Sequence, residues 1–160
     1  MRVVLAGVFI AIMLGSSAIA QSKKSRIEGV WRLDEMTADG KTEKLTQPSM
    51  YFFTKKHYSI IYVSSDAPRP ILPDIAKATA DELRAIYVDS FVANAGEYDI
   101  SKDGKISFWP KVAKHPGYMR DGNYNTSTFK ITGNTMTMTT ESANNYPVKT
   151  PTTSKFTRIE

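Results

Sequence analysis

Three polar turns divide much of this chain into pairs of short strands. The turns are residues 54–57, Asp103-Gly104 and Gly133-Asn134. The β-branched and aromatic runs that they separate are residues 50–53 and 58–63, 98–100 and 105–109, and 128–132 and 135–140. Such runs favour strands, and Asp-Gly or Gly-Asn between them favours a tight hairpin. Because hairpins pair neighbouring strands, the sequence predicts an antiparallel sheet made by local connections.

One segment has a helical pattern instead. Thr79 can cap a helix, and Glu82 three residues later completes a capping box. Four apolar side chains then follow at helical spacing: Leu83, Ile86, Tyr87 and Phe91. We therefore expect a helix over residues 80–95, entered through the proline-rich loop 67–73. Its apolar stripe has to be buried, so we expect it to cover a side or the mouth of the sheet structure.

Further strands are predicted over residues 27–36 and 155–159, with a bent segment at 111–119 that His115-Pro116-Gly117 interrupts. The total is about eight or nine strands with local connections. Such a set closes more naturally into a barrel than into a parallel sheet. The predicted fold is all-β, an antiparallel β-barrel of about 8–9 strands with one inserted α-helix.

The first twenty residues have the pattern of a secretory signal peptide. A basic start precedes the apolar residues 3–14, and Ala18-Ile19-Ala20 supplies a small-residue cleavage site. Twelve apolar residues are too short for a bilayer of about 30 Å. We therefore expect a signal peptide over 1–20, a flexible tether over 21–26, a barrel domain over 27–160, and a periplasmic or secreted protein without stable membrane insertion. The alternative is a buried N-terminal helix.

Charge and residue usage exclude several function classes. The chain has 21 Lys and Arg against 16 Asp and Glu, with the signs mixed along it, so a solvated surface is expected and no nucleic-acid partner. It has no cysteine and two histidines, which excludes thiolate metal sites and cysteine nucleophiles. No serine-hydrolase elbow or phosphate loop occurs. We expect no metal or cofactor and assign no catalytic residue.

Gly29-Val30-Trp31, on the first strand, resembles the G-x-W signature of lipocalin and calycin barrels. Arg158, on the last strand, is placed like the basic residue that packs over that tryptophan. The aromatic hairpin 51–62, the stretch 87–100 and the segment 114–118 are similar to the bacterial lipocalin-like domain family. The resemblance covers nearly all of residues 27–160 and implies an antiparallel, lipocalin-like barrel with an apolar interior.

Trp31 and Arg158 are expected to be structural. First and last strands are neighbours in a closed barrel, so the guanidinium can lie over the indole ring and gain cation–π attraction. The ring would then close one end of the barrel. The alternative reading is that Trp31 binds the ligand.

Aromatic side chains mark the candidate ligand site. We expect a pocket at the opposite end, with His115 near its rim and with walls formed by Tyr51, Phe53, Tyr62, Trp109 and Tyr118. Buried tyrosines need partners for their hydroxyls, which favours a partly polar cavity over a solid core. The leading hypothesis is an exported protein that binds a small hydrophobic or aromatic molecule. The alternatives are an isomerase or hydratase that uses His115 and tyrosines, and a structural or inhibitor-like module with a filled barrel.

Overall fold

The computed structural model describes residues 26–160, so the predicted signal peptide and most of the tether lie outside the described residues. The strands are β1 (Gly29–Ala38), β2 (Lys41–Lys44), β3 (Ser49–Phe53), β4 (His57–Val63), β5 (Phe91–Ile100), β6 (Lys105–Ala113), β7 (Asn125–Thr132), β8 (Thr135–Ala143), β9 (Tyr146–Pro147) and β10 (Thr153–Arg158). The helical turns are η2 (Ile75–Lys77), α2 (Ala80–Leu83), η3 (Arg84–Val88) and η4 (Pro116–Met119).

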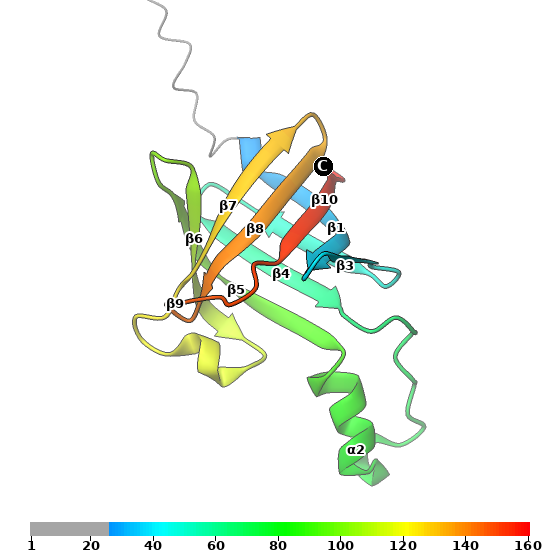
Figure 1. Cartoon of the computed structure of the whole chain (residues 1–160). Coiled ribbons are helices and arrows are strands. Elements are labelled where there is room, and N and C mark those ends of the chain that lie inside the picture. The colour runs from blue at the N-terminus through cyan, green and yellow to red at the C-terminus, as the bar shows by residue number, and fades with distance from the viewer. Residues whose placement is uncertain (1–25) are drawn as a thin grey trace, which may run out of the picture.

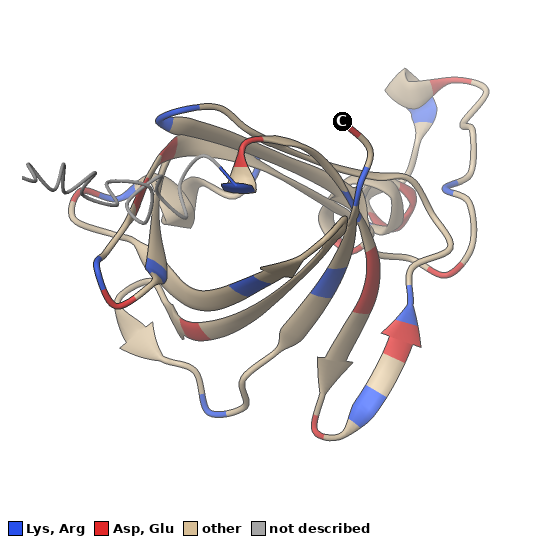
Figure 2. Ribbon diagram, turned by 90° about the horizontal axis from the view of Figure 1, so that it is seen from above, with Lys and Arg blue, Asp and Glu red and all other residues tan. Residues whose placement is uncertain are grey.

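Eight of these strands close into an antiparallel barrel, in the order β1-β3-β4-β5-β6-β7-β8-β10. β10 pairs with β8 on one side and with β1 on the other, which completes the ring (Figure 1). β2 adds a short hairpin to β1, and β9 extends the pairing of β8. The predicted antiparallel β-barrel is therefore confirmed. Viewed from above, charged residues of both signs are scattered around the ring (Figure 2).

The three hairpins predicted from the turns are all present. They join β3 to β4, β5 to β6 and β7 to β8, and they lie at one end of the barrel. Gly104 and Gly133 have φ values of 85° and 57°, which the turns require and which glycine adopts freely. The longer connections β4–β5, β6–β7 and β8–β10 lie at the other end, which we call the mouth.

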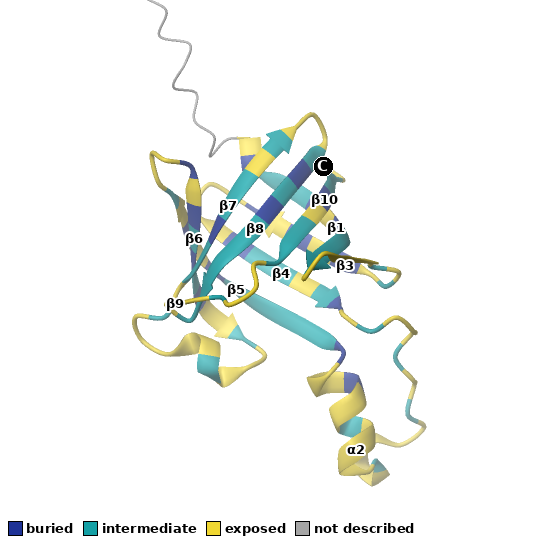
Figure 3. Cartoon of the chain, in the orientation of Figure 1, coloured by how far each residue is buried: buried dark blue, intermediate teal, exposed yellow. Residues whose placement is uncertain are grey.

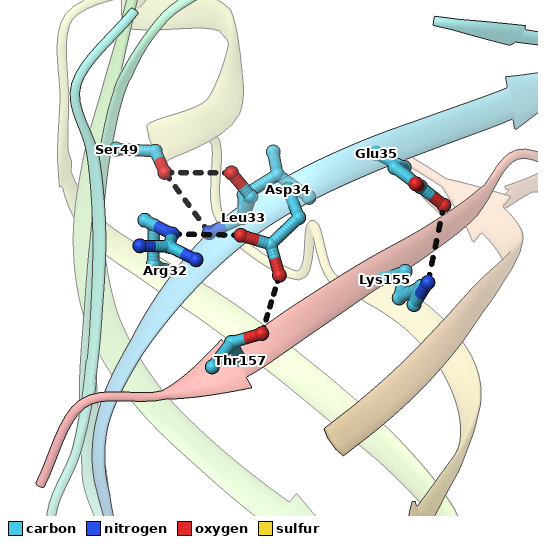
Figure 4. A network of polar contacts seen from close by, with 7 residues as sticks. All are labelled: Arg32, Leu33, Asp34, Glu35, Ser49, Lys155 and Thr157. Carbon is cyan, nitrogen blue, oxygen red and sulfur yellow. Dashed lines mark hydrogen bonds and ion pairs between the residues drawn. The ribbon is translucent and has the colours of Figure 1, made fainter. Parts of the chain in front are cut away.

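A β-bulge at Asp34 interrupts the pairing of β1 with β10, the contact that closes the barrel and that we call the seam. The pairing shifts between Leu33 and Glu35, which leaves Asp34 unpaired in the ladder. Its carboxylate accepts hydrogen bonds from Arg32 Nε at 2.7 Å and from Thr157 Oγ1 at 2.6 Å (Figure 4). The extra residue is thus held by side chains from both strands. Bulges of this kind increase local twist, which helps a sheet to close.

Ser49 ties β3 to the same place. Its buried hydroxyl accepts a hydrogen bond from Leu33 N at 2.9 Å and donates one to Leu33 O at 3.0 Å (Figure 4). The main-chain groups of Leu33 are therefore satisfied at the point where the strands shift, as buried polar groups must be. The Lys155–Glu35 ion pair crosses the seam at 3.4 Å but is largely exposed, so it contributes little.

The helix is shorter than predicted. The capping box forms, with Glu82 N donating to Thr79 Oγ1 and Thr79 N donating to the Glu82 carboxylate. Helical structure then ends at Val88 instead of residue 95. Ser90 Oγ bonds the carbonyls of Ala85 and Ile86, and the chain from Phe91 onward pairs with β4. The ladder with β4 therefore overrides the helical spacing of the apolar residues.

The prediction that this helix covers the barrel is also wrong. Residues 64–90, which we call the arm, project beyond the barrel from the ends of β4 and β5 (Figure 1). The apolar stripe is only partly covered: Ile86 is buried and Leu83 and Phe91 are intermediate, whereas Tyr87 is 45% exposed. Most of α2 and η3 is exposed in Figure 3. The capping box and local hydrogen bonds hold the arm, and burial contributes little to it.

The core fills the hairpin end of the barrel. Along β6 and β8, buried inward residues alternate with more exposed ones (Figure 3). Six large side chains are almost fully buried: Ile27, Trp31, Leu33, Ile106, Met136 and Phe156. Packing is therefore complete near Trp31, and any interior space lies nearer the mouth.

Candidate ligand-binding site

Trp31 closes the hairpin end. Its ring has no exposed surface, and its Nε1 donates a hydrogen bond to Ile27 O at 2.8 Å. Arg158 is directly opposite Trp31 in the β1–β10 pairing, and its guanidinium carbon lies 4.1 Å from the ring centroid. The guanidinium also donates to the carbonyls of Glu28 and Arg26. The expected contact between tryptophan and arginine is therefore present, and it ties both chain ends of the barrel together.

An interior cavity of about 170 Å³ lies between the buried Trp31 ring and the mouth. The aromatic part of its lining is Tyr51, Tyr58, Phe108, Tyr118 and Phe156. The polar part is Asn94, Asn125, Ser127, Thr140 and Ser154. Charged side chains are absent from this lining among the described residues. The barrel is thus partly open inside, with a neutral and mixed surface.

Tyr58 lines this cavity, and its buried hydroxyl is unsatisfied. The residue is 3% exposed, and within residues 26–160 its hydroxyl oxygen has no hydrogen-bond partner. Burial raises the pKa of Tyr58, so the group is a neutral phenol at physiological pH. A buried hydroxyl without a partner costs about 1–3 kcal/mol. A small turn of the Tyr58 ring would bring the hydroxyl to the cavity surface, where a polar group of a bound molecule would recover that energy.

Three more tyrosines lead from the interior to the mouth. The rings of Tyr51 and Tyr62 stack with centroids 6.1 Å apart. Burial raises the pKa of Tyr51, and the nearby Tyr62 raises it further. Burial also raises the pKa of Tyr62, with an added contribution from Tyr118. Tyr51 and Tyr62 are therefore neutral hydroxyl groups that can donate or accept a hydrogen bond.

Asn94 and Asn125 are site residues that sequence reasoning missed. Tyr98 and Gly96 are buried on β5, and two residues earlier the same alternation turns Asn94 inward. Ser127 is buried on β7, and Asn125 precedes it by two residues. Extending the strand alternation toward the mouth would have found both. Their carboxamides give the upper cavity donors and acceptors without charge.

A second pocket of about 510 Å³ opens at the mouth. It shares Tyr118 and Ala143 with the interior cavity, so the two spaces adjoin. Its other lining residues are His115, Gly117, Arg120, Asn123, Asn144 and Tyr146. η4 and the loop after β8 therefore form this pocket, and Tyr118 stands between it and the barrel interior.

The predicted site residues separate into groups. Tyr51 and Tyr118 line the interior cavity, and His115 lines the mouth pocket instead. Phe53 lies deeper, with its ring centroid 5.5 Å from that of Tyr98, and belongs to the core. Tyr62 packs beside Tyr51 and faces a separate hollow under the arm. Phe53 and Tyr62 are therefore not among the side chains that line the interior cavity.

Trp109 does not line the cavity, contrary to expectation. Its neighbours Phe108 and Pro110 are buried, so alternation turns Trp109 outward. It pairs with the exposed Glu97 on β5. On the outside it packs against Tyr124, with ring centroids 6.0 Å apart. Because Phe108 and Trp109 are both aromatic and adjacent, the sequence alone does not indicate which of the two faces inward.

Residues 26–160 bring together no group of three or more His, Asp or Glu side chains that would hold a metal ion. Within the same residues, no helix has the length and hydrophobicity needed to cross a membrane.

The chain has a structural likeness among the solved proteins. No protein-family profile matches the chain, and no curated protein matches it. The structure is similar to that of a lipocalin-like protein from Bacteroides uniformis ATCC 8492, at 17% sequence identity and a TM-score of 0.45. The match covers 82% of this chain and 97% of the other. The assignment of the fold rests on the closed strand pairing itself.

Proposed function

We propose that this protein binds a small, mostly apolar molecule inside its barrel. The observation that carries the proposal is the interior cavity with its buried and unpartnered Tyr58 hydroxyl. Ligand sites combine apolar walls with a few fixed polar groups, and this lining has that composition. Tyr58, Asn94 and Asn125 would hold the polar part of the molecule.

The cavity volume limits the ligand. A dry cavity of about 150 Å³ takes a benzene-sized molecule, and the interior space of about 170 Å³ is close to that size. A single aromatic ring therefore fits inside the barrel. A longer ligand would extend past Tyr118 into the mouth pocket.

Binding is favoured over the two alternatives. A module with a filled barrel would leave no interior space beside Tyr58. An isomerase or hydratase would place His115 beside the reacting atoms, whereas His115 lines the mouth pocket and is separate from the interior lining. The interior groups are neutral amides and hydroxyls, which suit hydrogen bonding better than proton transfer.

We expect p-cresol and indole to shift the ¹³C-methyl NMR signal of Met138, whose side chain lines the cavity. The methyl signal of Met50 should stay unchanged, because Met50 is 43% exposed on the outside of β3. Tyr58→Phe should weaken the binding of p-cresol by about 0.5–1.5 kcal/mol, the net contribution of one hydrogen bond. Saturable shifts at Met138 in a titration would give the affinities.

Ser154→Leu fills part of the cavity from β10 and serves as the blocked control. It should abolish the Met138 shift while the urea unfolding midpoint shows that the barrel remains folded. If Met138 does not respond to either probe at millimolar concentration in the wild-type protein, binding in the interior is contradicted.

We also propose that the protein is exported. The support is the basic start, the apolar residues 3–14 and the Ala18-Ile19-Ala20 site. Expressed with its leader in a Gram-negative host, the protein should leave the cytoplasm and begin at Gln21. Intact mass measurement of the periplasmic fraction checks this. A protein that keeps Met1 and stays in the cytoplasm would contradict export.

A further inference from the structure

Arg120 stands out among the charged groups of the mouth. It is the one arginine, lysine or carboxylate among residues 26–160 that lines either the interior cavity or the mouth pocket. The same described part of the chain offers it no ion-pair partner, whereas Arg32 and Arg84 pair with Asp34 and Asp89. A guanidinium without an ion-pair partner, beside a pocket without carboxylates, favours the binding of an anion in that pocket.

His115 adds a donor to the same pocket. Its Nδ1 accepts a hydrogen bond from Gly117 N at 3.2 Å. In the neutral imidazole the proton is then on Nε2, which leaves an N–H group to donate. The ring packs edge-on against Tyr118, with centroids 5.7 Å apart. His115 is thereby held beside the residue that separates the mouth pocket from the interior.

The loops that carry these groups are tied together by asparagines. Asn123 Nδ2 donates to Gly117 O at 3.0 Å, within the β6–β7 connection. Asn145, after β8, accepts from Tyr124 N at 2.7 Å and donates to Gly122 O at 2.8 Å. Two connections of the mouth are thus joined by side-chain hydrogen bonds, which fixes the shape of the pocket before a ligand arrives.

We infer that the ligand is an aromatic carboxylate, with its ring inside the barrel and its carboxylate in the mouth pocket against Arg120 and His115. This inference rests on the proposed function. The neutral interior accepts a ring but no charge, since burying an unpaired charge is costly. The adjoining mouth pocket supplies the cationic and N–H donors outside that space.

Asn144 narrows the choice of probe. The residue lines the mouth pocket, and its carboxamide oxygen is buried without a hydrogen-bond partner in the described chain. A donor next to the carboxylate of a ligand can pair with this oxygen once the Asn144 side chain turns toward the pocket. We therefore choose 3-phenyllactate, which has a hydroxyl at that carbon, and its neutral amide as the matched comparison.

The test is a titration of both compounds, followed by calorimetry and by the Met138 methyl signal. At low ionic strength 3-phenyllactate should bind at least about tenfold more tightly than the amide, as expected for charge-assisted hydrogen bonds. Arg120→Gln should reduce that preference to about twofold or less. Lys149→Gln removes an exposed charge from a mouth loop without touching the pocket, and should preserve the preference.

The outcomes separate the inference from the function that it rests on. Equal affinity of acid and amide in the wild-type protein, with Met138 shifting in both, would overturn the carboxylate inference and leave interior binding intact. An unchanged preference in Arg120→Gln would also overturn it. Absence of any Met138 shift with p-cresol, indole and both phenyl compounds would overturn interior binding itself.

Discussion

Replacing Trp31 with alanine should lower the free energy of unfolding by roughly 3–5 kcal/mol, the range for a fully buried large aromatic side chain. The ring has no exposed surface, and it loses its hydrogen bond to Ile27 O and its contact with Arg158 on removal. Urea unfolding followed by far-UV circular dichroism measures the change independently of indole fluorescence. Trp109→Ala removes the same side chain from the outer face and should cost about 1 kcal/mol or less.

The Arg158 variants separate cation–π contact from the hydrogen bonds of the guanidinium. Arg158→Lys keeps the charge and much of the stem over the ring, but it loses the fork that holds the carbonyls of Glu28 and Arg26. It should therefore destabilise the protein less than Arg158→Ala. If Trp31→Ala leaves the unfolding midpoint where Trp109→Ala does, Trp31 does not close the barrel.

The hairpins and the closed ring could be predicted because they depend on local chemistry. Turn residues such as Asp103-Gly104 fix the loop, and the alternation of apolar side chains fixes the inward face. The resemblance carried by Trp31 and Arg158 then placed the first strand next to the last. The turns and the alternation are visible within a few residues of sequence, whereas the closure was inferred from two residues at opposite ends of the domain.

Other features depend on contacts between distant segments. Residues 91–95 have helical spacing, yet β4 offers them a ladder, and no local pattern reports that β4 lies beside them. The arm carries an apolar stripe that predicts burial, while the connection simply projects from the barrel. β2 was missed because all four of its residues are exposed and its sequence, KTEK, has no apolar face.

The candidate site was predicted in part. Tyr51, Tyr118 and His115 line the two adjoining spaces, whereas Trp109 faces outward. A high density of aromatic residues predicts a barrel interior lined with aromatic side chains. It does not indicate on which face of the sheet each of these side chains lies. Pairing does: Glu97 is exposed on β5, and the register places Trp109 opposite it. The cavity volume itself depends on side-chain packing, which no sequence pattern specifies.

Gly96→Ala should destabilise the barrel by roughly 3 kcal/mol, at the upper part of the range for overpacking. A Cβ atom at Gly96 would lie 2.0 Å from Trp109 O and 2.9 Å from Lys111 N, and these are backbone atoms that cannot rotate away. β5 and β6 meet there at a bulge, where Gly96 pairs with Pro110. The added methyl group has to push the two strands apart, which breaks the ladder that sets the orientation of Trp109.

Gly40→Ala is the matched control, because a Cβ atom there meets nothing within 4 Å. Its φ of 71° makes alanine cost about 1 kcal/mol from backbone strain alone. Urea unfolding of the two variants therefore compares the cost of a steric contact at Gly96 with the cost of backbone strain at Gly40. Equal midpoints would mean that the β5–β6 bulge accommodates the added methyl group with little loss of stability. A much lower midpoint for Gly96→Ala would mean that the glycine is required by the close approach of β6, the strand that carries Phe108 to the interior cavity.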